Sequence, residues 1–467
     1  MSMRHAPENR FLTAPVWRVF AAQAVPMVLV LTMGGIQNIV DAVFLGRLVG
    51  ADALSAVSIV FPALMILIAL SSLTGGGMSS LLARHLGADR MDDAEAVFAR
   101  AHGLALTFAL SVIVLFFAFG RPVLTVLSGG PGRIADMAWT YLAISAVASP
   151  VQLLLSVHAD TWRNEGRAPV MALLSAVVTL ANIVLNYVLM VWLDMGVAGA
   201  ALGTALATVT GLALLAVPRA FGAGSVPLGA LLRHRWTGGW GPILALGAPL
   251  SLSFIGIALG SAIVLAVLRV TAGAAFADTV AAYGIVTRVY SFAYLPMMAV
   301  ALATQSIVGN NVGAGLHHRS DATLRLAMGV ILVYCLTVEL TLLGANRSIG
   351  RAFVHDPAVV DQLGTILRSM LLLFFTTGPI LILALYFQAV GQPARTAVLT
   401  LSKPFVIAPV LVISLGLIWG PPVIWLAYPI ADTVLVVLAL TVAVRVLRRH
   451  TTGPGFGLAA PVAEDLA

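Results

Sequence analysis

Asp41 is a carboxylate inside the first long apolar run of the sequence. An ionisable side chain within a membrane span is expensive and by default indicates function. Asp41 lies about six residues, or roughly 9 Å of helix, before Arg47. Burial disfavours the charged carboxylate, so such a site can load a proton on one side of a membrane and release it after repacking. A helix-end carboxylate that is exposed to water or paired with Arg47 is the alternative.

Four further polar side chains can reach the depth of Asp41. Asn182 and Asn186 are four residues apart and share one face of a predicted helix. Thr204 lies at matching depth in the next helix, and Asn38 lies one turn before Asp41. The set offers oxygen ligands for Na⁺, or a hydrogen-bond network around a protonatable acid. Hydrogen bonds that only hold the helices together are the alternative.

The predicted helix of Asp41 also contains a candidate hinge. Pro26 removes a backbone hydrogen bond, and the pair Gly34 and Gly35 weakens the helix further. Our hypothesis is that this helix bends when Asp41 changes its protonation or ion state. A static kink is equally compatible with these residues.

A substrate cavity of adaptable aromatic and methionine side chains would suit promiscuous binding. Each candidate, taken alone, is more typical of lipid-facing or core packing, and the arginine among them of a structural partner. The candidates are Tyr141, Tyr283, Arg288, Tyr290, Phe292, Met297 and Met298.

The composition excludes a soluble protein. Hydrophobic residues make up 60% of the 467 residues and charged residues 10%, against about 45–50% and about 25% in soluble domains. The formal charge is +7, but the basic residues lie singly between apolar runs, so we expect no nucleic-acid partner. Cys335 is the only cysteine, which excludes an intramolecular disulfide. We expect no cofactor and no metal apart from Na⁺ at the polar side chains around Asp41.

About twelve runs are long enough to span a bilayer. In the first half we expect spans over 17–45, 53–73, 97–119, 137–157, 170–193 and 197–217. In the second half we expect them over 241–268, 280–308, 324–344, 362–387, 396–419 and 422–447. The expected domains are an N-terminus (1–16), an N-lobe (17–217), a linker (218–240), a C-lobe (241–447) and a C-terminal tail (448–467).

The loops and internal repeats predict the orientation. Most loop arginines fall on the side of the N-terminus, which places both termini in the cytoplasm. Short similar segments recur at corresponding places of the two halves, as in Arg163–Pro169 and Gln388–Ala394. The fold class is therefore an all-α polytopic membrane protein of two six-helix bundles, related by a pseudo-twofold axis along the membrane normal.

Several motifs in this order resemble the MATE (multidrug and toxic compound extrusion) family. They are Asn38–Gly46, Ala281–Arg288, Gln305–Gly315 and Trp425–Asp432. The resemblance covers nearly all of the chain. It implies export of drugs or metabolites, coupled to the inward flow of protons or sodium.

The chain departs from one branch of that family. NorM-like members carry a glutamate on the seventh helix and an aspartate on the tenth, where this chain has Ser253–Ala258 and Phe374–Gly378. Asp41 resembles the DinF-like pattern, which implies cation binding in the N-lobe. Asn186 stands where that branch often has a second aspartate, and this leaves the choice between H⁺ and Na⁺ open.

The function we expect is efflux of small, amphiphilic, often cationic organic molecules by antiport with H⁺ or Na⁺, with alternating access between two lobes. A flippase for lipid-linked precursors or polysaccharides is the alternative. A metal-dependent membrane enzyme would need clustered acids, so we expect no enzymatic activity. Lys403 is the only lysine among 26 basic residues, which hints at a GC-rich genome. We expect a monomer in the lipid bilayer of a bacterial inner membrane.

Overall fold

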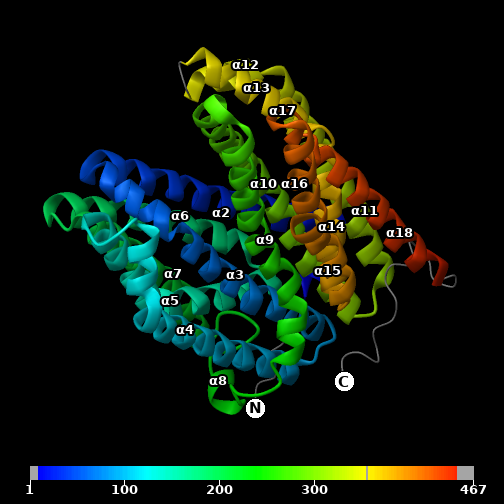
Figure 1. Ribbon diagram of the computed structural model, residues 1–467. Coiled ribbons are helices and arrows are strands. Elements are labelled where there is room, and N and C mark those ends of the chain that lie inside the picture. The colour runs from blue at the N-terminus through cyan, green and yellow to red at the C-terminus, as the bar shows by residue number, and fades with distance from the viewer. Residues whose placement is uncertain (1–8, 354–355, 450–467) are drawn as a thin grey trace, which may run out of the picture. The chain divides into compact units, whose positions relative to one another are not determined.

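The computed structural model describes residues 9–353 and 356–449, and every regular element in this part of the chain is a helix (Figure 1). Within these described residues, eleven helices are long and apolar enough to cross a membrane, or twelve if one bent pair counts as a single span. The predicted all-α polytopic fold is therefore confirmed. The first residues of the predicted N-terminus (1–8) and nearly all of the predicted C-terminal tail (from 450) lie outside the described residues.

The chain divides into two compact units, and the division falls within one helix, α9. Unit 1 extends to Ser251 and includes Gly309–Ala314. Its elements are α1 (Arg10–Thr13), α2 (Val16–Phe44), η1 (Leu45–Val49), α3 (Ala51–Gly87), α4 (Met91–Leu127), α5 (Arg133–Asn164), α6 (Ala168–Tyr187), η2 (Val188–Trp192), α7 (Gly196–Ala220), α8 (Ala230–Arg233) and the first part of α9 (Gly241–Thr271).

Unit 2 covers 252–308 and the described residues from Gly315 onward. It holds the rest of α9, η3 (Gly273–Ala275), most of α10 (Phe276–Gly313), α11 (His317–Gly344), α12 (Asn346–Phe353), α13 (Pro357–Leu371), α14 (Phe374–Val390), α15 (Pro393–Ser402), η4 (Lys403–Ile407), α16 (Ala408–Trp419), α17 (Pro421–Ile424) and α18 (Ala427–Arg449). The predicted lobe and linker boundaries and the pseudo-twofold axis stay predictions.

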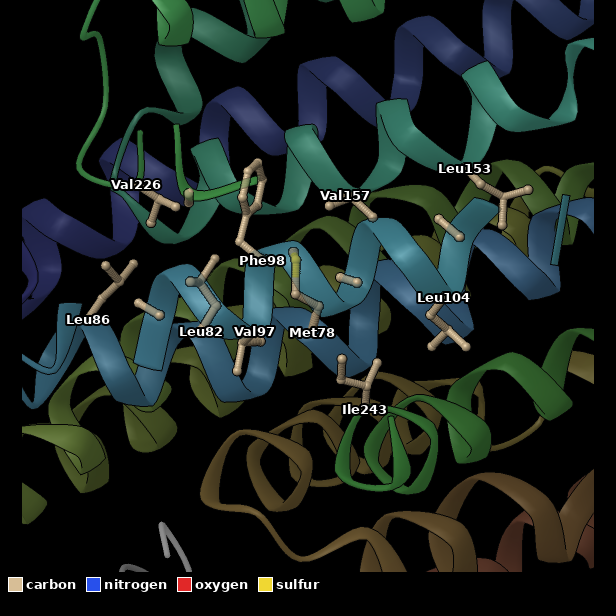
Figure 2. Packing of buried hydrophobic residues seen from close by; sticks show 14 of the residues in the cluster. Met78, Leu82, Leu86, Val97, Phe98, Leu104, Leu153, Val157, Val226 and Ile243 are labelled. Carbon is tan, nitrogen blue, oxygen red and sulfur yellow. The ribbon is translucent and has the colours of Figure 1, made fainter. Parts of the chain in front are cut away.

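The main core of unit 1 joins residues of α3, α4, α5, α8 and α9 (Figure 2). Met78 on α3, Phe98 on α4, Val157 on α5 and Ile243 on α9 pack together with no more than 1% of each side chain exposed. Gly77 allows α3 and α9 to meet, because a Cβ at this position would collide with the Ile243 carbonyl. Small residues at crossings are how membrane helices approach closely.

The connection between α7 and α9 is held to unit 1 by a buried ion pair. Arg219 contacts Glu165 at 2.7 Å, with 0% and 1% of their side chains exposed. Glu165 also accepts hydrogen bonds from the backbone N–H groups of Ser225 and Val226, at 3.0 and 2.9 Å. These additional donors are what a buried carboxylate needs to offset its desolvation. The first residues of the predicted linker are therefore anchored to the bundle.

The span expected over 362–387 is bent in unit 2, where two helices make it up. Helices α13 and α14 meet at an angle of 47°. Leu373 between them has φ 74°, a left-handed conformation that cannot continue a helix. The break exposes backbone N–H groups at the start of α14. Glu339 on α11 accepts from one of them, Phe375 N–H, at 2.8 Å.

We predict that Glu339→Ala destabilises the protein by about 1 kcal/mol, the usual cost of losing a helix N-terminal cap. Glu339→Gln keeps an acceptor oxygen and should cost less. Thermal unfolding of the purified variants in detergent measures both changes. Equal destabilisation by the two variants would show that the hydrogen bond to Phe375 is not what stabilises the break.

Candidate functional site

Asp41 and Asn186 meet within unit 1. Helices α2 and α6, which carry them, pack along each other (Figure 1). Asn186 Nδ2 donates to Asp41 Oδ1 at 2.6 Å. Asn186 is fully buried, whereas Asp41 is half-buried. Each residue stands within one turn of a π-helical segment, η1 or η2, and π-helical segments are frequent at functional sites.

The network continues along α6 to α7. Asn186 Nδ2 also lies 3.3 Å from Asn182 Oδ1, and Asn182 Nδ2 donates to Thr204 Oγ1 at 3.2 Å. The structure therefore brings Asp41, Asn182, Asn186 and Thr204 together. Asn38 is not brought in: its side chain is exposed, and within the described residues no hydrogen bond links it to the others.

Gly203 makes room for this network, and our sequence analysis missed it. A Cβ on Gly203 would collide with Asn186 Oδ1. One turn earlier, Gly199 lies against the Leu189 backbone, where a Cβ would be only 2.9 Å from the carbonyl carbon. The sequence signal was present as Gly199-Ala-Ala-Leu-Gly203, the small-residue spacing of close helix pairs. Asn186 Oδ1 is buried and has no hydrogen-bond partner among the described residues.

Apolar packing closes the side of the network nearest the η1 and η2 turns. Leu45, Ala53, Met190, Val197 and Ala200 form a buried cluster there, and Tyr141 packs partly buried against it. Tyr141, predicted as a cavity residue, is also within electrostatic range of Asp41. Beyond the cluster lies an open depression of about 630 Å³, whose lining includes four ionisable or polar side chains: Arg133, Asp136, Thr140 and Asp194. Met190 and Val197 of the cluster also line this depression, which contains none of the four network residues.

The three candidate hinge residues lie in one uninterrupted helix. Pro26 is inside α2, which runs continuously from Val16 to Phe44. A Cβ on Gly34 would meet no atom within 4 Å, so close packing does not explain this glycine. Gly35 follows it directly and is half-buried. The hinge role stays a prediction.

The remaining cavity candidates lie on α10 in unit 2. Met297 is fully buried and Tyr283 is 5% exposed, so both are core residues in this structure. Tyr283 stacks on Trp425 with ring centroids 5.5 Å apart, and Tyr290 meets Phe374 edge to face at 5.0 Å.

The other three cavity candidates are more accessible or have a different neighbour. Arg288 is exposed and belongs to none of the ion pairs in the described residues, whereas a structural partner was expected for it. Phe292 is 40% exposed. The Met298 sulfur lies 4.0 Å from the Tyr294 hydroxyl. Contact of any of the six with substrate stays a prediction.

The site lies in a bundle of helices long and apolar enough to span a membrane. Its one carboxylate is bound by the Asn186 amide, and the network continues through Asn182 to the Thr204 hydroxyl. Among the described residues, no group of three or more His, Cys, Asp or Glu side chains could hold a metal ion. The MatE family model matches residues 26–188 and 249–413. The chain therefore belongs to the MATE family, as its motifs predicted.

Individual relatives cover nearly the whole chain. This chain is 26% identical to the multidrug export protein MepA of Staphylococcus aureus over 447 residues, which are 95% of this chain and 96% of that protein. It is 24% identical over 399 residues to an FAD transporter of Shewanella oneidensis, which covers 84% of this chain and 86% of that protein. Crystal structures of MATE in conformations described as bent and straight share its fold, with TM-scores of 0.85 and 0.83 at 21% identity. They cover 94% of this chain and 97% and 98% of their own.

We predict that Gly203→Ala displaces the Asn186 amide and weakens its hydrogen bond to Asp41. The loss of a hydrogen bond to a charged group corresponds to about 1.5–3 kcal/mol, so the apparent affinity of Asp41 for H⁺ or Na⁺ should change at least tenfold. Transport rate as a function of H⁺ or Na⁺ concentration measures this affinity. The control is Gly211→Ala, on the same helix, where a Cβ would meet only side-chain atoms at 3.3 Å or more. The same change in both variants would contradict the prediction.

Proposed function

We propose that this chain exports small amphiphilic organic molecules, often cationic, in antiport with H⁺ or Na⁺, and that Asp41 binds the coupling cation. The observation that carries the proposal is the network of Asp41, Asn186, Asn182 and Thr204. A lone carboxylate in a membrane span is costly while charged, and one monovalent cation neutralises it. Binding and release of that cation can therefore drive a change between two packings of the helices.

The chemistry of Asn186 supports either cation. When Asp41 takes up a proton, its new O–H can donate to Asn186 Oδ1, which has no partner in the described chain. Acid and amide would then share two hydrogen bonds, and an unsatisfied buried acceptor, which costs about 1–3 kcal/mol, would disappear. Sodium could instead bind the oxygens of Asp41, Asn186 and Thr204, which are hard ligands.

The relatives support export of organic molecules. One is named a multidrug export protein and another an FAD transporter, and this chain covers 96% and 86% of their lengths. Both names describe transport of organic molecules without implying catalysis. We infer the same broad role here, in a multi-pass protein of the bacterial inner membrane with both termini in the cytoplasm.

Alternating access would use α2 as its moving element. Pro26 and Gly34 lie in the same helix as Asp41, so a bend in this helix and the ion state of the carboxylate can be coupled. Similar folds have been captured in forms described as bent and straight. We propose that cation binding at Asp41 shifts α2 between two such shapes.

We predict that Asp41→Asn abolishes gradient-driven efflux of ethidium from proteoliposomes, to less than a tenth of the wild-type rate. The amide cannot exchange a proton and holds no negative charge for sodium. Separate pH and sodium gradients identify the ion. Asp52→Asn, at a carboxylate that is 51% exposed, is the matched control and should retain efflux. Efflux that survives in Asp41→Asn would remove Asp41 from the mechanism. A wild type that moves no dye under either gradient would instead favour the flippase alternative.

The hinge is tested at Gly34, where an added methyl group meets open space. Gly34→Ala stiffens α2 by about 1 kcal/mol, so we expect transport to slow roughly fivefold while the cation dependence is preserved. Gly329→Ala on α11, also with nothing within 4 Å, is the control. Unchanged transport in Gly34→Ala would argue for a static helix.

A further inference from the structure

Unit 2 contains an ion pair in the middle of its spans. Lys403 is the first residue of η4 and lies well inside the span Pro393–Trp419. Asp432 lies well inside the span Pro421–Val446. Lys403 Nζ donates to Asp432 Oδ1, and η4 packs against α18. Both charged groups are therefore at membrane depth, rather than at helix ends where they could reach water.

The side chains of Lys403 and Asp432 differ in how much of their surface is exposed. The Asp432 side chain is 1% exposed, and its Oδ2 has no hydrogen-bond partner in the described residues. The Lys403 side chain is 20% exposed. An ammonium group has three N–H donors, and Asp432 is the one acceptor that Lys403 hydrogen-bonds within the described chain. A ligand that approaches this pair meets a cation with donors to spare.

Stability alone does not account for the pair. Replacing a buried ion pair by well-packed apolar residues is often neutral or stabilising, and a membrane span offers many such residues. Lys403 also begins a π-helical segment, a local irregularity that is frequent at functional sites.

Aromatic groups lie on the neighbouring turns. Tyr428, one turn before Asp432, has its hydroxyl 3.4 Å from that of Tyr283, which stacks on Trp425. Tyr290 is within electrostatic range of both Lys403 and Asp432. Tyr428 and Tyr290 are half-buried, so neither is fully enclosed by the protein.

We propose that Lys403 binds the carboxylate of an aromatic, amphiphilic substrate, and that Asp432 holds the ammonium in place and neutralises it when no substrate is bound. The proposal rests on the proposed export function and adds a substrate class to it, namely molecules with a carboxylate, including zwitterions. The carboxylate takes the spare N–H donors of Lys403, while Tyr290 and Tyr428 contact the aromatic ring. A purely cationic molecule gains nothing from Lys403.

The test uses two dyes that differ in one group, tetramethylrhodamine with a free carboxylate and its methyl ester. Fluorescence anisotropy measures their binding to the purified full-length protein in detergent without a gradient. The double variant Lys403→Met with Asp432→Asn removes both charges and leaves none uncompensated. We expect it to bind the carboxylate dye at least tenfold more weakly than wild type and the ester unchanged. Lys403→Arg, which keeps the positive charge, should retain most of the binding of the carboxylate dye.

Three results would overturn the proposal: equal weakening of both dyes, which marks a structural role for the pair; no weakening of either; or no binding of the carboxylate dye to wild type. Gradient-driven efflux of the methyl ester from proteoliposomes tests the export function separately. Wild-type protein that moves no ester but shows the expected difference in binding would refute export and leave the Lys403 site standing. Efflux of the ester by wild-type protein, together with equal weakening of both dyes in the double variant, would support export and refute the Lys403 site.

Discussion

The absence of water inside a bilayer is the constraint on which the rest of this structure depends. Backbone groups in the spans satisfy one another by forming helices. Polar side chains in the spans must find partners in the protein, as Asp41 does with Asn186, Lys403 with Asp432, and Glu339 with the backbone of Phe375. Each of these contacts joins two helices. The polar residues therefore help to determine how the spans pack, in addition to what they can bind.

Much of this arrangement was predictable from simple geometry. Apolar runs of membrane length fixed the spans, since a helix rises 1.5 Å per residue. The same rise set the depth of Asp41, Asn186 and Thr204, and the four-residue spacing placed Asn182 on the face of Asn186. The depth of each residue in the membrane and the helix face on which it lies were together enough to predict that these four side chains meet. The placement of Asn38 in this network was not met by the structure. A spacing of one helical turn brings Asn38 near Asp41 along the helix but does not determine where its side chain points.

The rest depended on tertiary contacts that leave little local trace. Leu373 has no preference for the left-handed conformation that it adopts. The helix break there is capped by Glu339, which accepts a hydrogen bond from the Phe375 N–H, 36 residues further along the chain. Gly203 carried a signal, but its role appears only when the Asn186 amide is seen to fill the space. Met297 and Arg288 lie on a helix that is apolar on most sides, so its sequence does not say which face is buried.

The two polar clusters differ in net charge and in their spare hydrogen-bonding groups, and the ligands proposed for them follow from both. In unit 1, the described network has one ionisable group, Asp41, because an amide stands at position 186. One proton or one sodium ion neutralises it, so a second cation would have no charge to compensate. In unit 2, Lys403 and Asp432 neutralise each other, and the cluster needs no cation. What it lacks is an acceptor for the remaining lysine donors. On the two proposals, the cation bound in unit 1 would supply the energy for transport, and the substrate carboxylate bound in unit 2 would supply the recognition.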